Sequence, residues 1–263
     1  MRKRCAALAL WTFAVLATAS PASADQLVVV APELPPMFHA DGTGRDALII
    51  REALAACGHG VRFRVVPMGR HWSDYGTGAA DAVAVVPPGM RLPGWASDVY
   101  ARYQNGASVL TSSGLAINSL ADLVGKRVVT FAGGTEILPG LREIADRFAD
   151  LRERADQMVH SNLLFAGRVD AVLGDGLIFA EYNRQLRERA GSGQHLPFDP
   201  NQAVLFTAIF PPSPYTVVFR NERLRDDFNR CLGILSTTGR IDDIARAAVE
   251  PYRDTVGNRY LGY

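Results

Sequence analysis

Apolar runs and helical patterns alternate along the start of the chain. Residues 26–31 are a β-branched run followed by Pro32, which indicates a buried strand and a rigid loop. Residues 45–57 carry apolar side chains at helical spacing and stop at Gly58, so we predict an amphipathic helix. Residues 61–65 alternate strictly between apolar and polar, which is typical of a half-buried strand. Strand, helix and strand in this order favour a parallel α/β sheet.

A short pattern occurs twice in the chain. Residues 78–83 (GAADAV) and 167–172 (GRVDAV) each follow a predicted short helix and open an apolar strand. The glycine can end the helix and the aspartate can turn the chain into the strand. Residues 126–131 (KRVVTF) predict another strand, followed by Gly133 and a helical stretch to about residue 149. Two α/β lobes of similar build are therefore expected rather than one large sheet.

Two extended stretches separate the predicted lobes. Residues 105–112 and 202–210 are β-prone and flanked by Gly, Ser and Pro, as crossovers between lobes are. After the second crossover we predict a strand at 215–219 and two helices, at about 222–236 and 242–252. The predicted division places residues 25–108 and 205–263 in the first lobe and residues 109–204 in the second.

The first 24 residues have the order of a secretory signal peptide. A basic start (2–4) precedes an apolar run (5–18) and a small-residue cleavage signal (22–24). We expect cleavage before Asp25 and a periplasmic protein without stable membrane insertion. An uncleaved anchor is the alternative, but the run is shorter than the ~20 residues that span a bilayer. Cys5 opens the apolar run rather than following it, so we do not expect a lipoprotein.

Export changes the charge of the protein. The full chain has 28 Lys and Arg, 27 Asp and Glu and 48% hydrophobic residues. Removing residues 1–24 takes away three basic side chains and no acidic one, so the formal charge goes from +1 to −2. A balanced chain with this apolar content is neither disordered nor suited to bind nucleic acid.

Cys57 and Cys231 are the two thiols of the mature chain. The periplasm favours a disulfide between them. Two separately buried cysteines are the alternative, since a free cysteine packs well as a small hydrophobe. Neither residue belongs to a CxxC motif or to a set with metal-ligand spacing. If the chain returns to the first lobe after the second crossover, the two cysteines share a lobe.

No signature of catalysis or of a bound cofactor stands out. The five histidines are scattered, with no pair at metal-ligand spacing. The sequence has no Gly-x-Ser-x-Gly elbow, phosphate-binding lysine loop or dinucleotide fingerprint. We therefore expect neither metal nor cofactor, and a binding protein rather than an enzyme.

The mature chain as a whole resembles the bacterial extracellular solute-binding proteins of family 3, the amino-acid-type receptors of ABC importers. The matching stretches run in unbroken order: PELPPMFHADG (32–42), VVPMGRHWSDYGTGAADAVAVV (65–86), PPGMR (87–91), LADLVGKRVVTFAGGTE (120–136), LLFAGRVDAVLGD (163–175) and a closing FNRCLGILSTTGRIDDIARA. The resemblance implies a type II periplasmic-binding-protein fold, with two α/β lobes joined by two hinge strands. It also implies a monomer that closes on a ligand and delivers it to an importer's membrane subunits.

The same resemblance implies which side chains contact the ligand. Arg91 corresponds to the arginine of the family's T-P-x-R motif, and its guanidinium can hold a carboxylate in two parallel hydrogen bonds. Gly133 and Thr135 can hold an anion at a helix start, or simply cap that helix. Asp175 corresponds to a carboxylate that receives an amino group, or caps the helix that starts near Leu177.

The chain also departs from the family. Along the strand into the arginine motif, residues 84–86 end at Val86 without a hydroxyl, and two prolines follow. Leu34 stands where many members have an aromatic ring, with Phe38 nearby. With Leu34, Phe38 and Val86 as candidate walls, we expect a less polar cleft.

Three functions are compatible with these features. We expect capture of an amino acid or related carboxylate for an ABC importer. A periplasmic accessory module with the same fold and a modified cleft is an alternative. Another is an enzyme that resembles cyclohexadienyl dehydratase, with Glu33 or Glu136 as a general acid or base.

Overall fold

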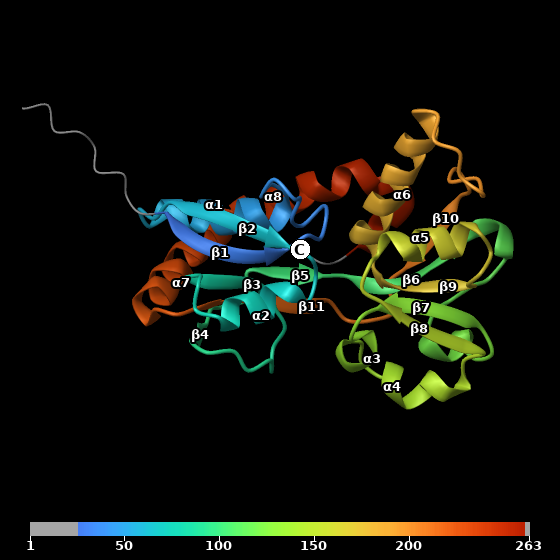
Figure 1. Ribbon diagram of the computed structural model, residues 1–263, viewed down its shortest axis with the longest axis horizontal. Helices are drawn as coiled ribbons and strands as arrows, with labels where there is room; N and C mark the ends of the chain where they lie inside the picture. Colours follow the sequence, from blue (N-terminus) through green and yellow to red (C-terminus); the bar gives the residue numbers. More distant parts are fainter. Residues whose placement is uncertain (1–25, 261–263) are drawn as a thin grey trace, which may run out of the picture.

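The computed structural model describes residues 26–260, so the predicted signal peptide lies outside the described residues. Figure 1 shows two α/β lobes side by side, each a twisted sheet with helices packed on it. Short 3₁₀ turns complete the chain at Thr111–Ser113, Leu120–Leu123, Ala145–Arg147, Glu250–Tyr252 and Gly257–Arg259. The predicted two-lobed α/β architecture is confirmed.

Lobe 1 is built on a sheet with the strand order β2-β1-β3-β11-β4, in which β5 also pairs with β11. β1 is parallel to β2 and β3, whereas β11 is antiparallel to its neighbours. The strands are β1 (Leu27–Pro32), β2 (Val61–Val66), β3 (Ala82–Val86), β4 (Trp95–Ala96), β5 (Ala101–Tyr103) and β11 (Ser213–Phe219). The helices are α1 (Arg45–Ala56), α2 (Arg70–Gly76), α7 (Glu222–Thr237) and α8 (Arg240–Val249).

Lobe 2 has the strand order β10-β6-β9-β7-β8. β7 is parallel to β8 and β9, and β6 is antiparallel to β9 and β10. The strands are β6 (Asn105–Leu110), β7 (Arg127–Phe131), β8 (Asp150–Arg154), β9 (Ala171–Asp175) and β10 (Val204–Thr207). The helices are α3 (Gly134–Ile137), α4 (Leu141–Ile144), α5 (Met158–Phe165) and α6 (Gly176–Gly191).

The repeated Gly-x-x-Asp-Ala-Val motif has the same role in both lobes. In lobe 1 an Asp81 oxygen accepts the backbone N–H of Val28 at 2.7 Å, at the start of β1. In lobe 2 an Asp170 oxygen accepts the backbone N–H of Arg127 at 2.8 Å, at the start of β7. Each aspartate thus joins the first parallel strand of its lobe to the strand that the motif opens.

The chain crosses between the lobes at Gln104 and again over residues 208–212. Because β6 and β10 pair with each other in the lobe 2 sheet, residues 105–108 and 205–207 belong to lobe 2 rather than lobe 1. The C-terminal segment makes a third connection: α9 (Arg253–Val256) packs against α6 and β10 of lobe 2 (Figure 1). The expected division gave no hint of this third connection.

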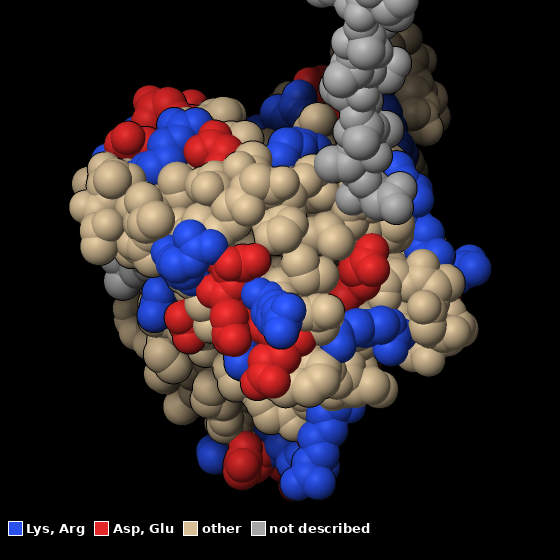
Figure 2. Space-filling model, turned by 90° about the vertical axis from the view of Figure 1, so that its left-hand side faces the viewer, with Lys and Arg blue, Asp and Glu red and all other residues tan. Residues whose placement is uncertain are grey.

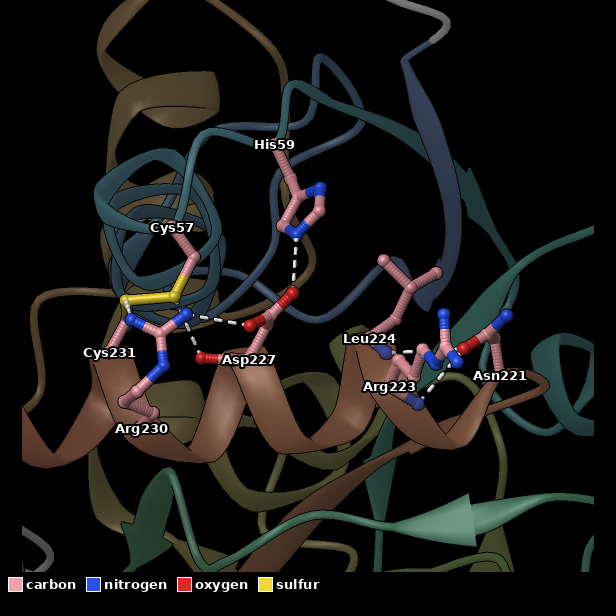
Figure 3. Close-up of polar contacts among 8 residues, drawn as sticks. All are labelled: Cys57, His59, Asn221, Arg223, Leu224, Asp227, Arg230 and Cys231. Carbon is pink, nitrogen blue, oxygen red and sulfur yellow. Dashed lines mark hydrogen bonds and ion pairs between the residues drawn. A yellow bond between two sulfur atoms is a disulfide. The ribbon is translucent and has the colours of Figure 1, made fainter.

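The predicted disulfide is present between Cys57, at the end of α1, and Cys231 in α7. Figure 3 shows Asp227, one turn before Cys231, between His59 and Arg230, at 3.1 Å and 2.6 Å. Two helices of lobe 1 that are far apart in the sequence are therefore joined covalently, and the hydrogen bond between His59 and Asp227 lies beside this link.

The charges on the end of lobe 1 are mixed in sign. On the face seen in Figure 2, acidic and basic side chains lie next to one another rather than in separate patches. Within residues 26–260, no helix is long and apolar enough to cross a membrane.

Candidate functional site

The carboxyl ends of four strands meet between the lobes. Residues at or just beyond the ends of β1, β3, β7 and β9 line one small cavity, which we call the cleft centre. Its lining is Leu34, Met68, Val85, Tyr103, Asn105, Phe131, Gln157, Asp175, Ile178 and Tyr215. The cavity measures about 20 Å³, room for about one water molecule. Sites for small organic ligands measure roughly 300–1,000 Å³, so side chains fill the centre of the cleft.

Two larger cavities adjoin the cleft centre. The proline-lined cavity measures about 560 Å³ and shares Tyr215 with the centre. Its walls are Pro87, Pro88, Gly89, Met90, Glu136, Ile137, Pro139, Pro211, Pro212, Ser213, Pro214 and Tyr215.

The mixed-charge cavity measures about 490 Å³ and shares Met68 and Gln157 with the centre. Its other walls are Glu33, Pro67, Ala155, Asp156, Met158, Tyr182, Gln185 and Arg189. Either has the size of a ligand site.

Asp175 reaches the cleft centre but is bonded within the protein. One carboxylate oxygen accepts the backbone N–H groups of Leu177 at 2.9 Å and Ile178 at 3.1 Å, so the residue caps α6. The other oxygen accepts the hydroxyl of Tyr260 at 3.0 Å. Burial raises the pKa of the Asp175 carboxyl to about 6, against the opposing effect of the nearby Arg45 cation. The capping role is therefore present, and contact with a ligand amino group stays a prediction.

A buried polar network continues from Asp175 into lobe 1. The Arg45 guanidinium donates to the Tyr260 hydroxyl at 3.1 Å and to Asp46 at 2.8 Å. The hydroxyls of Tyr100 and Tyr103 both donate to the second Asp46 oxygen at 2.8 Å. Burial disfavours the Arg45 cation, but Asp46 holds the pKa of that guanidinium well above its ordinary value. The network thus links the first turn of α1 in lobe 1 to the first turn of α6 in lobe 2.

Aromatic rings close the rest of the centre. The rings of Tyr103 and Tyr215 lie 4.3 Å apart, and the Arg45 guanidinium lies 5.1 Å from the Tyr103 ring. Burial raises the pKa of the Tyr215 hydroxyl, with Asp175 and Asp46 acting in the same direction. These rings exclude water from the polar network, and the lower local dielectric constant strengthens its hydrogen bonds.

The loop predicted to hold an anion already holds a carboxylate of this chain. Glu153 on β8 accepts the backbone N–H groups of Gly133 and Thr135, both at 2.9 Å, and the Thr135 hydroxyl at 2.7 Å. Burial opposes its ionisation, but the bonds from Thr135 and Gly133 lower the pKa of Glu153. A Cβ added at Gly134 would lie 2.4 Å from the hydroxyl oxygen of Thr130, so a larger residue at this position would require a shift of Thr130.

The other predicted ligand contacts are spread over lobe 1. Leu34 lines the cleft centre as expected. Arg91 is exposed beyond the turn after β3. Phe38 is buried in the lobe 1 core, edge-on to Phe63 at 5.4 Å, and Val86 is buried in β3. The linings of the cleft centre and of the two larger cavities do not include Arg91, Phe38 or Val86. Their ligand roles stay predictions.

Val85 is held in a conformation that a β-branched residue rarely adopts. Its φ of 58° lies in the left-handed region, at the irregularity where β3 pairs with β11. Its carbonyl accepts the Trp72 indole N–H at 3.3 Å, and its side chain faces the cleft centre. Strained residues of this kind concentrate at functional sites. The apolar run gave no signal of this strain, because it depends on the pairing with β11.

The candidate acids of the enzyme alternative lie apart. Glu33 lines the mixed-charge cavity and Glu136 lines the proline-lined cavity, where it forms an ion pair with Arg142. Burial lowers the pKa of His71 and of His160 to about 4, so both rings are neutral near pH 7. Within residues 26–260, the lining of the cleft centre includes neither of these two glutamates and neither of these two histidines.

Sequence reasoning missed the residues that close the cleft. Arg45 and Asp46 begin α1, which was predicted from the spacing of its apolar residues alone. Tyr100 and Tyr103, which are buried, were not singled out from the sequence. Tyr260 lies 215 residues from Arg45. No local pattern marks a contact over that separation.

Comparison with known proteins shows the fold. No protein-family model matches the chain, and no curated protein matches it. The GluR0 ligand-binding core in complex with L-glutamate superposes with a TM-score of 0.67, at 20% identity over 86% of this chain and 98% of that one. An ancestral arginine-binding protein bound to arginine gives 0.66, at 22% identity over 86% and 97%. A histidine kinase sensor domain similar to periplasmic binding proteins gives 0.63, at 18% identity over 86% and 96%. The expected periplasmic-binding-protein fold, and the resemblance to solute-binding proteins at the level of that fold, are confirmed.

Proposed function

We propose that the protein is a periplasmic solute-binding protein, which holds a small organic solute between its lobes and delivers it to the membrane subunits of an ABC importer. The observation that carries this proposal is the convergence of the ends of β1, β3, β7 and β9 beside two cavities of ligand size. Ligands of open α/β sheets bind outside the carboxyl ends of the strands. Solved neighbours of the same fold that hold glutamate or arginine support the proposal.

An amino acid or related carboxylate is the ligand class that the family resemblance implies. That class requires Arg91 for the carboxylate and Asp175 for the amino group. Arg91→Ala tests the requirement: it abolishes the binding of a carboxylate ligand, and an unchanged Kd would remove Arg91 from the site. Lys126→Ala, which changes the one lysine of the mature chain, controls for lost positive charge.

A thermal-shift screen tests the proposed function itself. The panel contains amino acids, small carboxylates, polyamines and uncharged ring compounds. A true ligand stabilises the protein by about 2.7 kcal/mol at a hundredfold excess over its Kd. A panel without any hit would contradict solute binding.

One observation favours a second function, that of a periplasmic accessory or sensing module. The Arg45–Tyr260–Asp175 contacts join the lobes, which opposes the hinge motion that delivery to an importer uses. The kinase sensor domain among the structural neighbours shows that the fold occurs in such a role. Small-angle scattering distinguishes the two: a radius of gyration unchanged by saturating ligand favours the module, and a decrease favours the importer receptor.

A further inference from the structure

The inference concerns the class of the ligand and rests on the proposed function. Two of the groups expected to recognise a zwitterion, Asp175 and the 133–135 loop, are bonded to other parts of the chain, and the third, Arg91, does not line the cleft centre. Asp175 is held by its own helix and by Tyr260. The 133–135 loop is held by Glu153. Recognition of a charged ligand there would require these bonds to be broken first.

The proline-lined cavity offers a different chemistry. Six of its lining residues are prolines, contributed by the loop after β3, the segment after α3, the second crossover and the start of β11. Proline has no backbone N–H, so these six residues present ring carbons and carbonyl oxygens but no donors, and the hydroxyl donors of the lining are those of Ser213 and Tyr215. Met90, Ile137 and the ring of Tyr215 add further apolar surface.

The single charged residue of this lining is already neutralised. Glu136 forms an ion pair with Arg142, and both side chains are more than half exposed. An ammonium ligand would therefore compete with Arg142, and a carboxylate ligand would meet Glu136 without a free cation in the wall. Charge complementarity selects an uncharged occupant.

The walls are also rigid. Proline fixes its own φ, so the cavity loses little conformational freedom when a ligand enters. Pockets that bind small molecules are mostly apolar with a few polar groups, and at about 560 Å³ this cavity has their usual size. A flat ring can pack on prolyl faces from both lobes at once.

We propose that the ligand binds in the proline-lined cavity and is a small, uncharged and largely apolar ring compound. The cavity lies between the lobes, so such a ligand contacts lobe 1 through Pro88 and Met90 and lobe 2 through Ile137. The cleft centre stays closed by the network while the ligand is bound.

Calorimetric titration with two uncharged ring probes, indole and cyclohexanol, tests the inference. L-Glutamate and L-arginine serve as charged comparators. Pro88→Asp and Pro211→Asp each add a carboxylate to the wall at an exposed loop position, where the fold tolerates it. Pro67→Asp makes the same change at an exposed proline of the mixed-charge cavity and is the matched control.

We expect saturable binding of at least one ring probe, weakened about tenfold or more by Pro88→Asp and by Pro211→Asp and unchanged by Pro67→Asp. Binding of neither probe would overturn the inference, as would probe binding that the two wall variants leave unchanged. Tighter binding of L-glutamate or L-arginine would also overturn it but leave the proposed function standing. The proposed function fails separately, when the whole thermal-shift panel gives no hit.

Discussion

The cleft centre and the proline-lined cavity adjoin each other at Tyr215 and yet have opposite chemistry. The centre contains Asp175, the only one of the polar side chains expected to contact a ligand that lines it, and it has about 20 Å³ of space. The proline-lined cavity has six prolines, which lack a backbone N–H, and it measures about 560 Å³. Polar residues at the meeting point of two lobes can serve the contact between the lobes rather than the ligand. The volume of a cavity, rather than the polarity of its lining, then indicates where a ligand fits.

Asp46→Ala, in the buried polar network beside the cleft centre, is expected to have the largest effect on the free energy of unfolding. The change leaves the buried Arg45 guanidinium and the hydroxyls of Tyr100 and Tyr103 without their shared acceptor. Removing one partner of a buried ion pair costs about 3–5 kcal/mol. Urea denaturation measures the loss. Pro211→Asp, in the proline-lined cavity, is the control and changes stability by less than about 0.5 kcal/mol; equal losses in both variants would contradict the difference between the regions.

Asp175→Asn tests the burial of the cleft centre through the pH dependence of stability. The folded-state pKa of about 6 lies above the ordinary 3.8, so the carboxyl's contribution to stability is full below pH 3.8 and is lost as pH rises through 6. Asparagine keeps the helix cap and does not titrate. The stability of the variant relative to the parent therefore rises between pH 4 and pH 6 by about 1.4 kcal/mol per unit, then levels off. Urea midpoints at pH 4.5, 5.5 and 7.5 measure this; a difference independent of pH would show that Asp175 is not buried as described.

Tyr260→Phe removes the hydroxyl between the two lobes and keeps the ring. Arg45 loses one acceptor and Asp175 loses one donor. The expected loss is about 1–3 kcal/mol. Faster amide hydrogen exchange in the first turn of α6 is expected as well, because the lobe contact loosens there. Tyr252→Phe, which removes a hydroxyl bonded to Glu181 within the C-terminal connection, is the matched control and leaves exchange in that turn unchanged. The account is wrong if the two variants behave alike.

Glu153→Gln has the smallest expected effect. The amide keeps one acceptor oxygen for the 133–135 loop but loses the charge that strengthens three hydrogen bonds. We expect a loss of about 1 kcal/mol by urea denaturation. Indole affinity stays unchanged, because the loop's bonds face Glu153 rather than the proline-lined cavity. A higher Kd for indole in this variant would show that the 133–135 loop and the proline-lined cavity are coupled.

Local patterns were sufficient to predict several elements of this fold, but not β8 (Asp150–Arg154), and the helix expected up to about residue 149 is divided into the short helices α3 and α4. The alternation at residues 61–65 became β2, the glycine stop at Gly58 follows the end of α1, and the repeated Gly-x-x-Asp-Ala-Val opens β3 and β9. The sequence left Cys57 and Cys231 either paired or separately buried, and the return of the chain to lobe 1 brings them together in a disulfide. The elements that were predicted depend on residues close in the sequence.

Local patterns could not predict which polar side chains of the candidate site are already bonded within the protein. Asp175 was recognised both as a cap and as a ligand contact, but its second oxygen is bonded by Tyr260, 85 residues away. Thr135 was recognised as an anion holder, but the anion is Glu153 on a neighbouring strand. Whether a polar side chain is available to a ligand is decided by such distant partners. No local pattern indicates that the prolines at 211, 212 and 214 lie beside Pro88, because these residues are far apart in the sequence.

Methionine methyl groups provide the most direct test of the central claim that the cleft centre stays closed while the proline-lined cavity takes the ligand. Met90 lines the proline-lined cavity, Met68 lines the cleft centre, Met158 lines the mixed-charge cavity, and Met37 is buried in the lobe 1 core. A ¹³C-methyl-methionine NMR titration with indole reads all four sites in one spectrum. The account predicts a saturable shift of the Met90 signal with Met68, Met158 and Met37 unchanged. A shift of Met68 with Met90 unchanged would contradict it.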